Sequence, residues 1–238
     1  MSDTVVFVPA WNEEENLPAV LDGLHEQLPD AAVLVVDDGS TDRTAEIARE
    51  HGAEVLSFGA NKGLRTAIAS GYAYAQEHEY EFAGRVDADG QHPVHELSRL
   101  LDRVRTDEAD AAFGSRFVAG DGYAEYRYRP SAPRALGIAA LRRLMEIRLD
   151  RPLADATSGM YAVRAVAMPL LALPYTSAAP EVEGLIRLAE AGLRIEEVPV
   201  DMREREHGES KLRGIMSFKV VFTVVAVVLG GWIWRKRR

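Results

Sequence analysis

The feature that most constrains this chain is the alternation of short apolar runs with segments of helical periodicity. Residues 5–8 and 33–36 are apolar throughout, as strands buried on both faces are. Between them, residues 14–28 place leucine and valine on one side of a helix. The pattern predicts a β-α-β unit with two parallel strands and a crossover helix.

The same alternation continues along the chain. Helical spacing is expected over residues 40–50, 66–78, 93–104, 135–148 and 182–191, and strands over residues 54–58, 82–86 and 111–113. Residues 118–134 mix Gly, Tyr, Arg, Asp and Pro without a period, which predicts a long loop. We therefore expect an α/β fold with a mostly parallel sheet flanked by helices, and such sheets bind ligands at the carboxyl ends of their strands.

Charge divides the chain into an acidic body and a basic end. All 37 acidic residues precede Ile215, whereas Lys219 and residues 235–238 are basic. Because residues 215–234 are largely apolar, we expect a catalytic domain over residues 1–214 and a C-terminal helix over 215–238 that anchors in a membrane or lies at its interface. An acidic body also disfavours nucleic acid as a partner.

Cysteine is absent from the sequence, which excludes disulfides, thiolate metal sites and cysteine nucleophiles. Any metal must bind oxygen or imidazole ligands. The first residues show neither a charged leader nor an apolar signal core. With the basic tail, these features predict a protein at the cell membrane whose catalytic domain lies on the cytoplasmic side.

The strongest candidates for chemistry directly follow the strand predicted over residues 82–86. If the chain stays extended, Asp87, Asp89 and Gln91 face one way. Their oxygens would then bind Mg²⁺ or Mn²⁺, with phosphates completing the coordination. His92 is either a further ligand or a packing residue. The alternative for the whole segment is an acidic turn that only ends the strand.

Polar residues also follow the first two predicted strands, with Trp11, Asn12 and Glu13 after one and residues 37–42 after the other. Because these strands are parallel neighbours, their ends meet at one edge of the sheet. A turn alone would account for the polar residues 38–40 of the second segment. Three polar or acidic strand ends together indicate a cation or a sugar hydroxyl as partner.

Seven short motifs occur in one order: VPAWNE at 8–13, VDDGSTD at 36–42, NKGL at 61–64, DADGQH at 87–92, GSR at 114–116, DATSG at 155–159 and REHGESK at 205–211. Together they resemble the family 2 glycosyltransferases of GT-A fold, specifically the dolichyl-phosphate mannosyltransferase-like branch of the polyprenyl-phosphate glycosyltransferases. The resemblance spans nearly all of the chain before the apolar tail.

The resemblance implies a donor site made of several motifs. Around the base and ribose of the nucleotide it places Pro9, Trp11, Glu13 and Asp37. For the metal and the donor diphosphate it implies Asp87, Asp89 and Gln91. On a segment that closes over the phosphates it places Arg205, Ser210 and Lys211. Of the last group, Lys211 is expected to be catalytic; the alternative is a solvated surface lysine.

The acceptor phosphate is expected beside Arg116, at the end of the strand predicted over residues 111–113. Further candidates from the loop are Arg127, Ser131 and Arg134. The usual arrangement of arginine and serine in the family is altered here by Pro130 and Pro133. Arg116 is therefore the preferred contact and, with Asp89 and Lys211, completes the residues expected to be catalytic.

The resemblance further implies transfer of a hexose to a polyprenyl or dolichyl phosphate, with Mg²⁺ or Mn²⁺ as cofactor. Mannose from GDP is the first choice of donor and glucose from UDP the second. A phosphate oxygen would attack the anomeric carbon in line and invert it. Because the second pKa of a phosphate monoester is about 6, no strong general base is required.

Two other functions are compatible with the residues. In the first, a family 2 enzyme glycosylates a soluble saccharide or protein, and Asp89 or a later acid activates a neutral hydroxyl as general base. In the second, the chain is a nucleotide-binding membrane scaffold without catalytic activity. Transfer without added lipid would favour the first, and donor hydrolysis would exclude the second.

Overall fold

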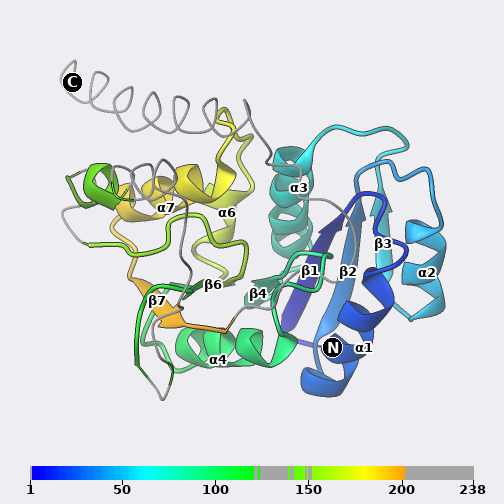
Figure 1. Cartoon of the computed structure of the whole chain (residues 1–238), viewed down its shortest axis with the longest axis horizontal. Helices are drawn as coiled ribbons and strands as arrows, with labels where there is room; N and C mark the ends of the chain where they lie inside the picture. Colours follow the sequence, from blue (N-terminus) through cyan, green and yellow to red (C-terminus); the bar gives the residue numbers. More distant parts are fainter. Residues whose placement is uncertain are drawn as a thin grey trace.

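A central sheet of seven strands organises the part of the protein that the structure describes (Figure 1). This computed structural model describes residues 2–120, 123, 139, 142–147, 149 and 152–201. The strands are β1 (Thr4–Ala10), β2 (Ala32–Asp37), β3 (Glu54–Ser57), β4 (Phe82–Arg85), β5 (Ala111–Ser115), β6 (Tyr161–Arg164) and β7 (Ile195–Pro199). Their order in the sheet is β3-β2-β1-β4-β6-β5-β7.

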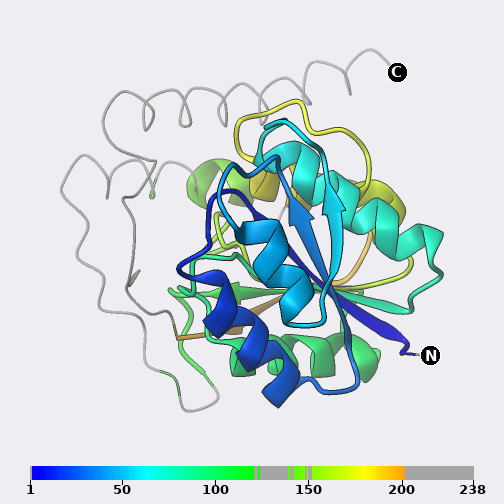
Figure 2. The same ribbon diagram turned by 90° about the vertical axis from the view of Figure 1, so that its right-hand side faces the viewer.

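Helices cover both faces of the sheet (Figures 1 and 2). One face packs against α1 (Leu17–Gln27), α2 (Thr44–Glu50) and α4 (Val94–Arg105). The other packs against α3 (Leu64–Glu77), α6 (Met168–Leu171) and α7 (Pro180–Glu190). All residues of β1 are buried, which explains the apolar run at residues 5–8, because each face of a covered strand contacts a hydrophobic core.

The predicted β-α-β unit is confirmed, since β1 pairs in parallel with β2. Two helix starts were predicted too early. Helix α1 begins at Leu17, after a turn in which the Asn16 amide donates to the Glu13 carbonyl. Helix α2 begins at Thr44, whose amide donates to the Asp42 carboxylate. Short polar side chains at such positions bond to nearby backbone and favour turns and caps over helix interiors.

Strands β6 and β7 and the short helix α6 were not predicted. Strand β6 runs antiparallel to both of its neighbours, β4 and β5, whereas the other pairings are parallel. The sheet is therefore mixed. Because β6 is reversed, Tyr161 at its start pairs with Arg85 at the end of β4. The residues that lead into β6 thus reach the same edge as the residues that follow β4.

Several predicted segments lie wholly or partly outside the described residues. Most of the loop predicted over 118–134 is among them; its described members include Gly120 and Tyr123, which form an isolated bridge. Residues 142–147 are helical, in agreement with the helix predicted over 135–148. The tail at 215–238 is outside. No helix within the described part of the chain has the length and apolar character needed to cross a membrane.

Candidate active site

The carboxyl ends of β1 and β2 bring together most of the residues predicted to surround the nucleotide. Pro9 pairs with Val36, and Ala10 pairs with Asp37. Trp11, which directly follows β1, keeps 37% of its surface exposed. An exposed indole beside two parallel strand ends provides a flat apolar surface against which a nucleoside could pack.

Hydrogen bonds between the two loops fix the position of this edge. The Asn12 amide donates to Ser40 Oγ at 3.0 Å, and Asn12 Oδ1 accepts from the Thr41 amide at 2.8 Å. The Glu13 amide donates to Thr44 Oγ1 at 2.9 Å. The loop after β1 is therefore tied to the loop after β2, although 28 to 31 residues separate the bonded pairs.

Asp37 and Asp38 have different surroundings at the end of β2. The buried Asp37 carboxylate accepts from the Ser40 amide at 2.9 Å and from Ser57 Oγ at 2.7 Å. Asp38 accepts from the amides of Lys62 and Gly63, directly before helix α3. A carboxylate there satisfies free amides and complements the helix dipole. Asp38 thus stabilises the fold, while Asp37 stays at the predicted nucleotide edge.

The segment after β4 differs from the extended conformation that we predicted. β4 ends at Arg85, and the chain turns at residues 88–90, with Gly90 at φ +71°. The Gln91 amide donates to Asp89 Oδ1 at 3.1 Å, a local bond that favours a turn. The alternation that would align Asp87, Asp89 and Gln91 is therefore wrong. Asp87 and Asp89 still follow the end of β4, and their metal-binding role stays a prediction.

The buried Arg85 side chain donates a hydrogen bond to the Asp87 carboxylate. Its side chain is only 3% exposed, and Nη2 donates to Asp87 Oδ1 at 3.0 Å and to Glu181 Oε1 at 3.1 Å. Burial opposes the charge of Arg85, but Asp87 and Glu181 outweigh it, so the pKa of Arg85 is raised. Burial raises the pKa of Glu181; the charge of Arg85 opposes this shift without cancelling it. A buried cation thus joins two carboxylates from distant parts of the sequence.

Gly159 approaches the other oxygen of Asp87. A Cβ atom at Gly159 would lie 2.3 Å from Asp87 Oδ2, closer than any non-bonded contact allows. His92 Nδ1 lies 3.9 Å from the same oxygen, and the ring is buried with no hydrogen bond to either nitrogen. Burial lowers the pKa of His92, against the fields of Asp87 and Asp89. The glycine of the DATSG motif therefore leaves room for the Asp87 carboxylate.

Arg116, the predicted contact to the acceptor phosphate, forms a bidentate ion pair with Asp155. Nε lies 2.6 Å from Asp155 Oδ2 and Nη2 lies 2.8 Å from Oδ1, while Nη2 also donates to Thr157 Oγ1. Burial raises the pKa of Asp155, but the charge and hydrogen bonds of Arg116, together with a hydrogen bond from Thr157, outweigh this effect, so the net shift is downward. Glu197 in β7 accepts from the amides of Ala154 and Asp155. Arg116 is thus held in one orientation, and its role toward a phosphate stays a prediction.

The remaining predicted site residues lie outside the described part of the chain. These are Arg127, Ser131, Arg134, Arg205, Ser210 and Lys211. Sequence interpretation assigned no role to Arg85, Asp155, Gly159 or Glu181. A signal for Arg85 was present, because a charged residue within a buried strand needs a partner of opposite charge.

The chemistry of the site fits a divalent cation that binds together with a diphosphate. Among the described residues, no group of three or more histidine, aspartate or glutamate side chains could hold a metal alone. Asp87 and Asp89 supply two carboxylates, and the Asp87 side chain is 32% exposed. Mg²⁺ typically binds to one or two carboxylates and completes its coordination with water and substrate phosphates. The residues present fit that mode of binding.

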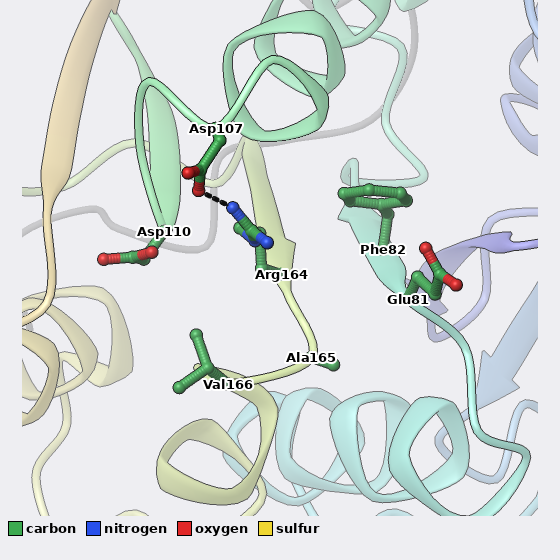
Figure 3. A pocket seen from close by; sticks show the side chains of 7 residues that line it. All are labelled: Glu81, Phe82, Asp107, Asp110, Arg164, Ala165 and Val166. Atoms are coloured by element: carbon green, nitrogen blue, oxygen red, sulfur yellow. Dashed lines mark ion pairs between the residues drawn. The ribbon is translucent and has the colours of Figure 1, made fainter.

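A pocket of about 340 Å³ lies at the opposite edge of the sheet (Figure 3). Its lining residues are Glu81, Phe82, Asp107, Asp110, Arg164, Ala165 and Val166. Phe82 begins β4 and Arg164 ends the reversed β6, so the pocket is remote from the end of β4 that leads to Asp87. Arg164 points toward Asp107 and forms an ion pair with it. This pocket is therefore separate from the candidate active site.

Comparison with known proteins identifies the family. The model described as Glycosyl transferase family 2 matches residues 5–167, which is more than half of the chain. The chain belongs to glycosyltransferase family 2. As a glycosyltransferase it is an enzyme, and the matched region contains Asp87, Asp89, Arg116 and Gly159.

Curated relatives resemble this glycosyltransferase over most of its length. The undecaprenyl-phosphate mannosyltransferase of Micrococcus luteus is 36% identical, covering 88% of this chain and 87% of its own. The polyprenol monophosphomannose synthase of Mycolicibacterium smegmatis is 31% identical, covering 98% of this chain and 90% of its own. The predicted branch of the family is therefore confirmed by its named relatives.

A solved structure confirms the fold of the glycosyltransferase. Glucosyl-3-phosphoglycerate synthase from Mycobacterium tuberculosis, in complex with Mn²⁺, uridine diphosphate and glucosyl-3-phosphoglycerate, superposes with a TM-score of 0.70. It is 24% identical and covers 94% of this chain and 79% of that one. At this identity the similarity supports the shared fold and does not indicate a shared substrate.

Proposed function

We propose that this enzyme transfers a hexose from a nucleoside diphosphate sugar to a polyprenyl phosphate, with Mg²⁺ or Mn²⁺ as cofactor. Mannose from GDP is the first choice of donor and glucose from UDP the second. The observation that carries the proposal is the similarity, over 88% and 98% of this chain, to an undecaprenyl-phosphate mannosyltransferase and a polyprenol monophosphomannose synthase. The carboxylates of Asp87 and Asp89 at the end of β4 support it, because a metal–diphosphate needs such a site.

The residues at the sheet edge would bind three different groups: the nucleoside, the metal and the acceptor phosphate. Trp11 and Asp37 would contact the nucleoside. Asp87 and Asp89 would hold the metal, which when bound neutralises charge on the leaving diphosphate. Arg116, oriented by Asp155, would supply positive charge near the acceptor phosphate. The phosphate oxygen forms the new bond to the anomeric carbon as the nucleoside diphosphate leaves, which inverts that carbon.

Attachment to a membrane is part of the proposal. The apolar segment and basic end at residues 215–238 would bring the enzyme to the surface that contains its lipid acceptor. We further propose that the catalytic domain lies on the cytoplasmic side, where nucleotide sugars are made. Because the acceptor is restricted to two dimensions, attachment raises its effective concentration at the site.

A donor screen tests the proposed function. Purified full-length protein is mixed with polyprenyl phosphate, Mg²⁺ or Mn²⁺, and GDP-mannose, UDP-glucose or other nucleotide sugars, and the lipid product is read by mass. The expected product is a polyprenyl phosphate heavier by one hexose. Transfer to a soluble saccharide without lipid would contradict the proposed acceptor. Absence of both transfer and donor hydrolysis would favour a scaffold without catalytic activity.

A further inference from the structure

His92 combines burial with a lack of hydrogen bonds. The residue is 5% exposed, yet neither Nδ1 nor Nε2 has a hydrogen-bond partner. Leaving a buried polar group unpaired costs about 1–3 kcal/mol, and most buried side-chain polar atoms therefore have a partner. A hydrogen bond that forms when a ligand binds would offset part of this cost.

The carboxylate nearest to the ring is that of Asp87. His92 Nδ1 lies 3.9 Å from Asp87 Oδ2, which is beyond hydrogen-bond distance. A charge-assisted N–H···O bond is about 2.7–2.9 Å long, so a relative movement of about 1 Å would form it. The other oxygen, Oδ1, already accepts from Arg85 at 3.0 Å. Arg85 and His92 therefore approach different oxygens of the same carboxylate.

We propose that His92 is a positioning residue for Asp87. When the metal and nucleoside diphosphate bind, His92 Nδ1–H donates to Asp87 Oδ2, and Arg85 and His92 together orient the carboxylate. A carboxylate oxygen has two lone pairs, so an oxygen that accepts a hydrogen bond can also bind a metal ion. The inference rests on the proposed function, because it requires Asp87 to bind the metal–diphosphate.

A direct bond from His92 to the metal is the competing explanation. Both ring nitrogens are buried from solvent, and Asp87 Oδ2 is already the carboxylate oxygen near Nδ1. A small movement suffices for the hydrogen bond, whereas ligation would require the ion to reach a buried atom. The geometry thus favours a bond to the carboxylate, in the way that outer partners orient metal-binding side chains in other proteins.

Three substitutions separate the two ring nitrogens. His92→Asn places an N–H near the position of Nδ1, His92→Gln places one near Nε2, and His92→Phe keeps a ring without either donor. Calorimetry on the full chain measures Mn²⁺ affinity in the presence of GDP or UDP, without acceptor. Loss of a residue that orients a metal ligand typically weakens metal affinity about 10- to 100-fold. We expect such a loss for His92→Phe and His92→Gln, and a change below about threefold for His92→Asn.

His51 provides a matched control. Its Nδ1 lies 2.9 Å from the Ile47 carbonyl at the end of helix α2, away from the turn after β4. His51→Phe should leave Mn²⁺ affinity unchanged. Circular dichroism of all variants checks the fold, and the comparison of His92→Asn with His92→Gln remains decisive if His92→Phe does not fold.

The experiments distinguish failure of the His92 inference from failure of the proposed function. Unchanged affinity in all His92 variants, or equal losses for His92→Asn and His92→Phe, would overturn the role of Nδ1. A nitrogen coupling to Mn²⁺ from ¹⁵N-labelled histidine, seen by electron spin echo and absent from His92→Phe, would show direct ligation instead. If the parent protein binds no Mn²⁺ in the presence of either nucleotide, the metal-dependent proposed function fails as well. If the parent binds and the variants match it, only the His92 inference fails.

Discussion

Arg85 Nη2 lies 3.1 Å from Glu181 Oε1 and joins the end of strand β4 to the first turn of helix α7 across 96 residues of sequence. The same nitrogen donates to Asp87. Because a buried cation is stable only when its charge is matched, this arrangement couples the carboxylate proposed for metal binding to helix α7. The stability of the fold and the geometry of the site therefore share one residue.

Arg85→Met should destabilise the protein, because it leaves Glu181 buried without its cation. Breaking a buried ion pair from one side costs about 3–5 kcal/mol, whereas replacing both partners with apolar residues is often close to neutral. Urea unfolding should therefore show a large loss for Arg85→Met and a partial recovery for the double variant with Glu181→Leu. Equal stability of parent and single variant would contradict this account.

Gly159→Ala should weaken metal-dependent donor binding by about tenfold or more, because the new methyl group would displace Asp87 Oδ2. The matched control is Gly23→Ala in helix α1, where the added Cβ would lie 3.2 Å from Val94 Cγ2 and no ligand contact is proposed. Calorimetry with Mn²⁺ and nucleotide measures both variants. Equal binding by the two would show that Asp87 tolerates the displacement.

Asp89→Asn should reduce transfer by at least about a hundredfold, which corresponds to roughly 2.7 kcal/mol of the activation barrier. The amide keeps the shape and the turn but removes the negative charge required at the metal. Circular dichroism should remain that of the parent. Activity within a few-fold of the parent at saturating metal would exclude Asp89 as a ligand, and Asp87→Asn should weaken both metal and donor binding.

The Arg116–Asp155 pair should make stability depend on pH in a defined direction. The pKa of Asp155 in the folded state is lowered, so its contribution is present above the ordinary value of about 3.9 and is lost as pH falls through the lowered pKa. The difference in free energy of unfolding between the parent and Asp155→Asn should be constant above about pH 5 and shrink below about pH 4. A difference that grows at low pH would contradict the pairing.

Truncation after Gly214 tests the role proposed for the C-terminal tail. The shortened protein should no longer sediment with liposomes and should transfer slowly to long polyprenyl phosphates, because the apolar residues and their basic end are removed. Metal-dependent nucleotide binding should persist. Continued sedimentation, or loss of nucleotide binding, would show that the tail acts differently.

The parts of the fold that were predicted are those with a local signal. Apolar runs located β1 and β2, and helical spacing located α1, α3, α4 and α7, because burial on one or both faces leaves a period in the sequence. Strand β6 was not predicted, and its direction could not have been, because strand direction leaves no such period. The extended conformation expected at Asp87, Asp89 and Gln91 was wrong because a hydrogen bond within the segment, from the Gln91 amide to Asp89, favours a turn.

The site was predicted less completely than the fold. The motifs indicated Asp87, Asp89 and Arg116, whose roles stay predictions, and the structure places Asp37 and Pro9 at the expected edge. The partners of these residues could not be read from sequence, because Arg116 finds Asp155 39 residues away. Which distant charges meet is decided by strand order, and strand order is a property of the assembled sheet.

The pairing of β6 with β4 determines which fragments of the enzyme can fold on their own. Strand β4 is interior only because β6 pairs with it, and Arg85 is neutralised in part by a residue of α7. A fragment that ends after β5 and lacks β6 and α7 would expose β4 as an open edge and leave a buried cation short of one partner. The half proposed to bind the nucleotide is therefore not a module that could be excised or transplanted, and we expect it to bind nucleotide only when β6 and α7 are folded against it.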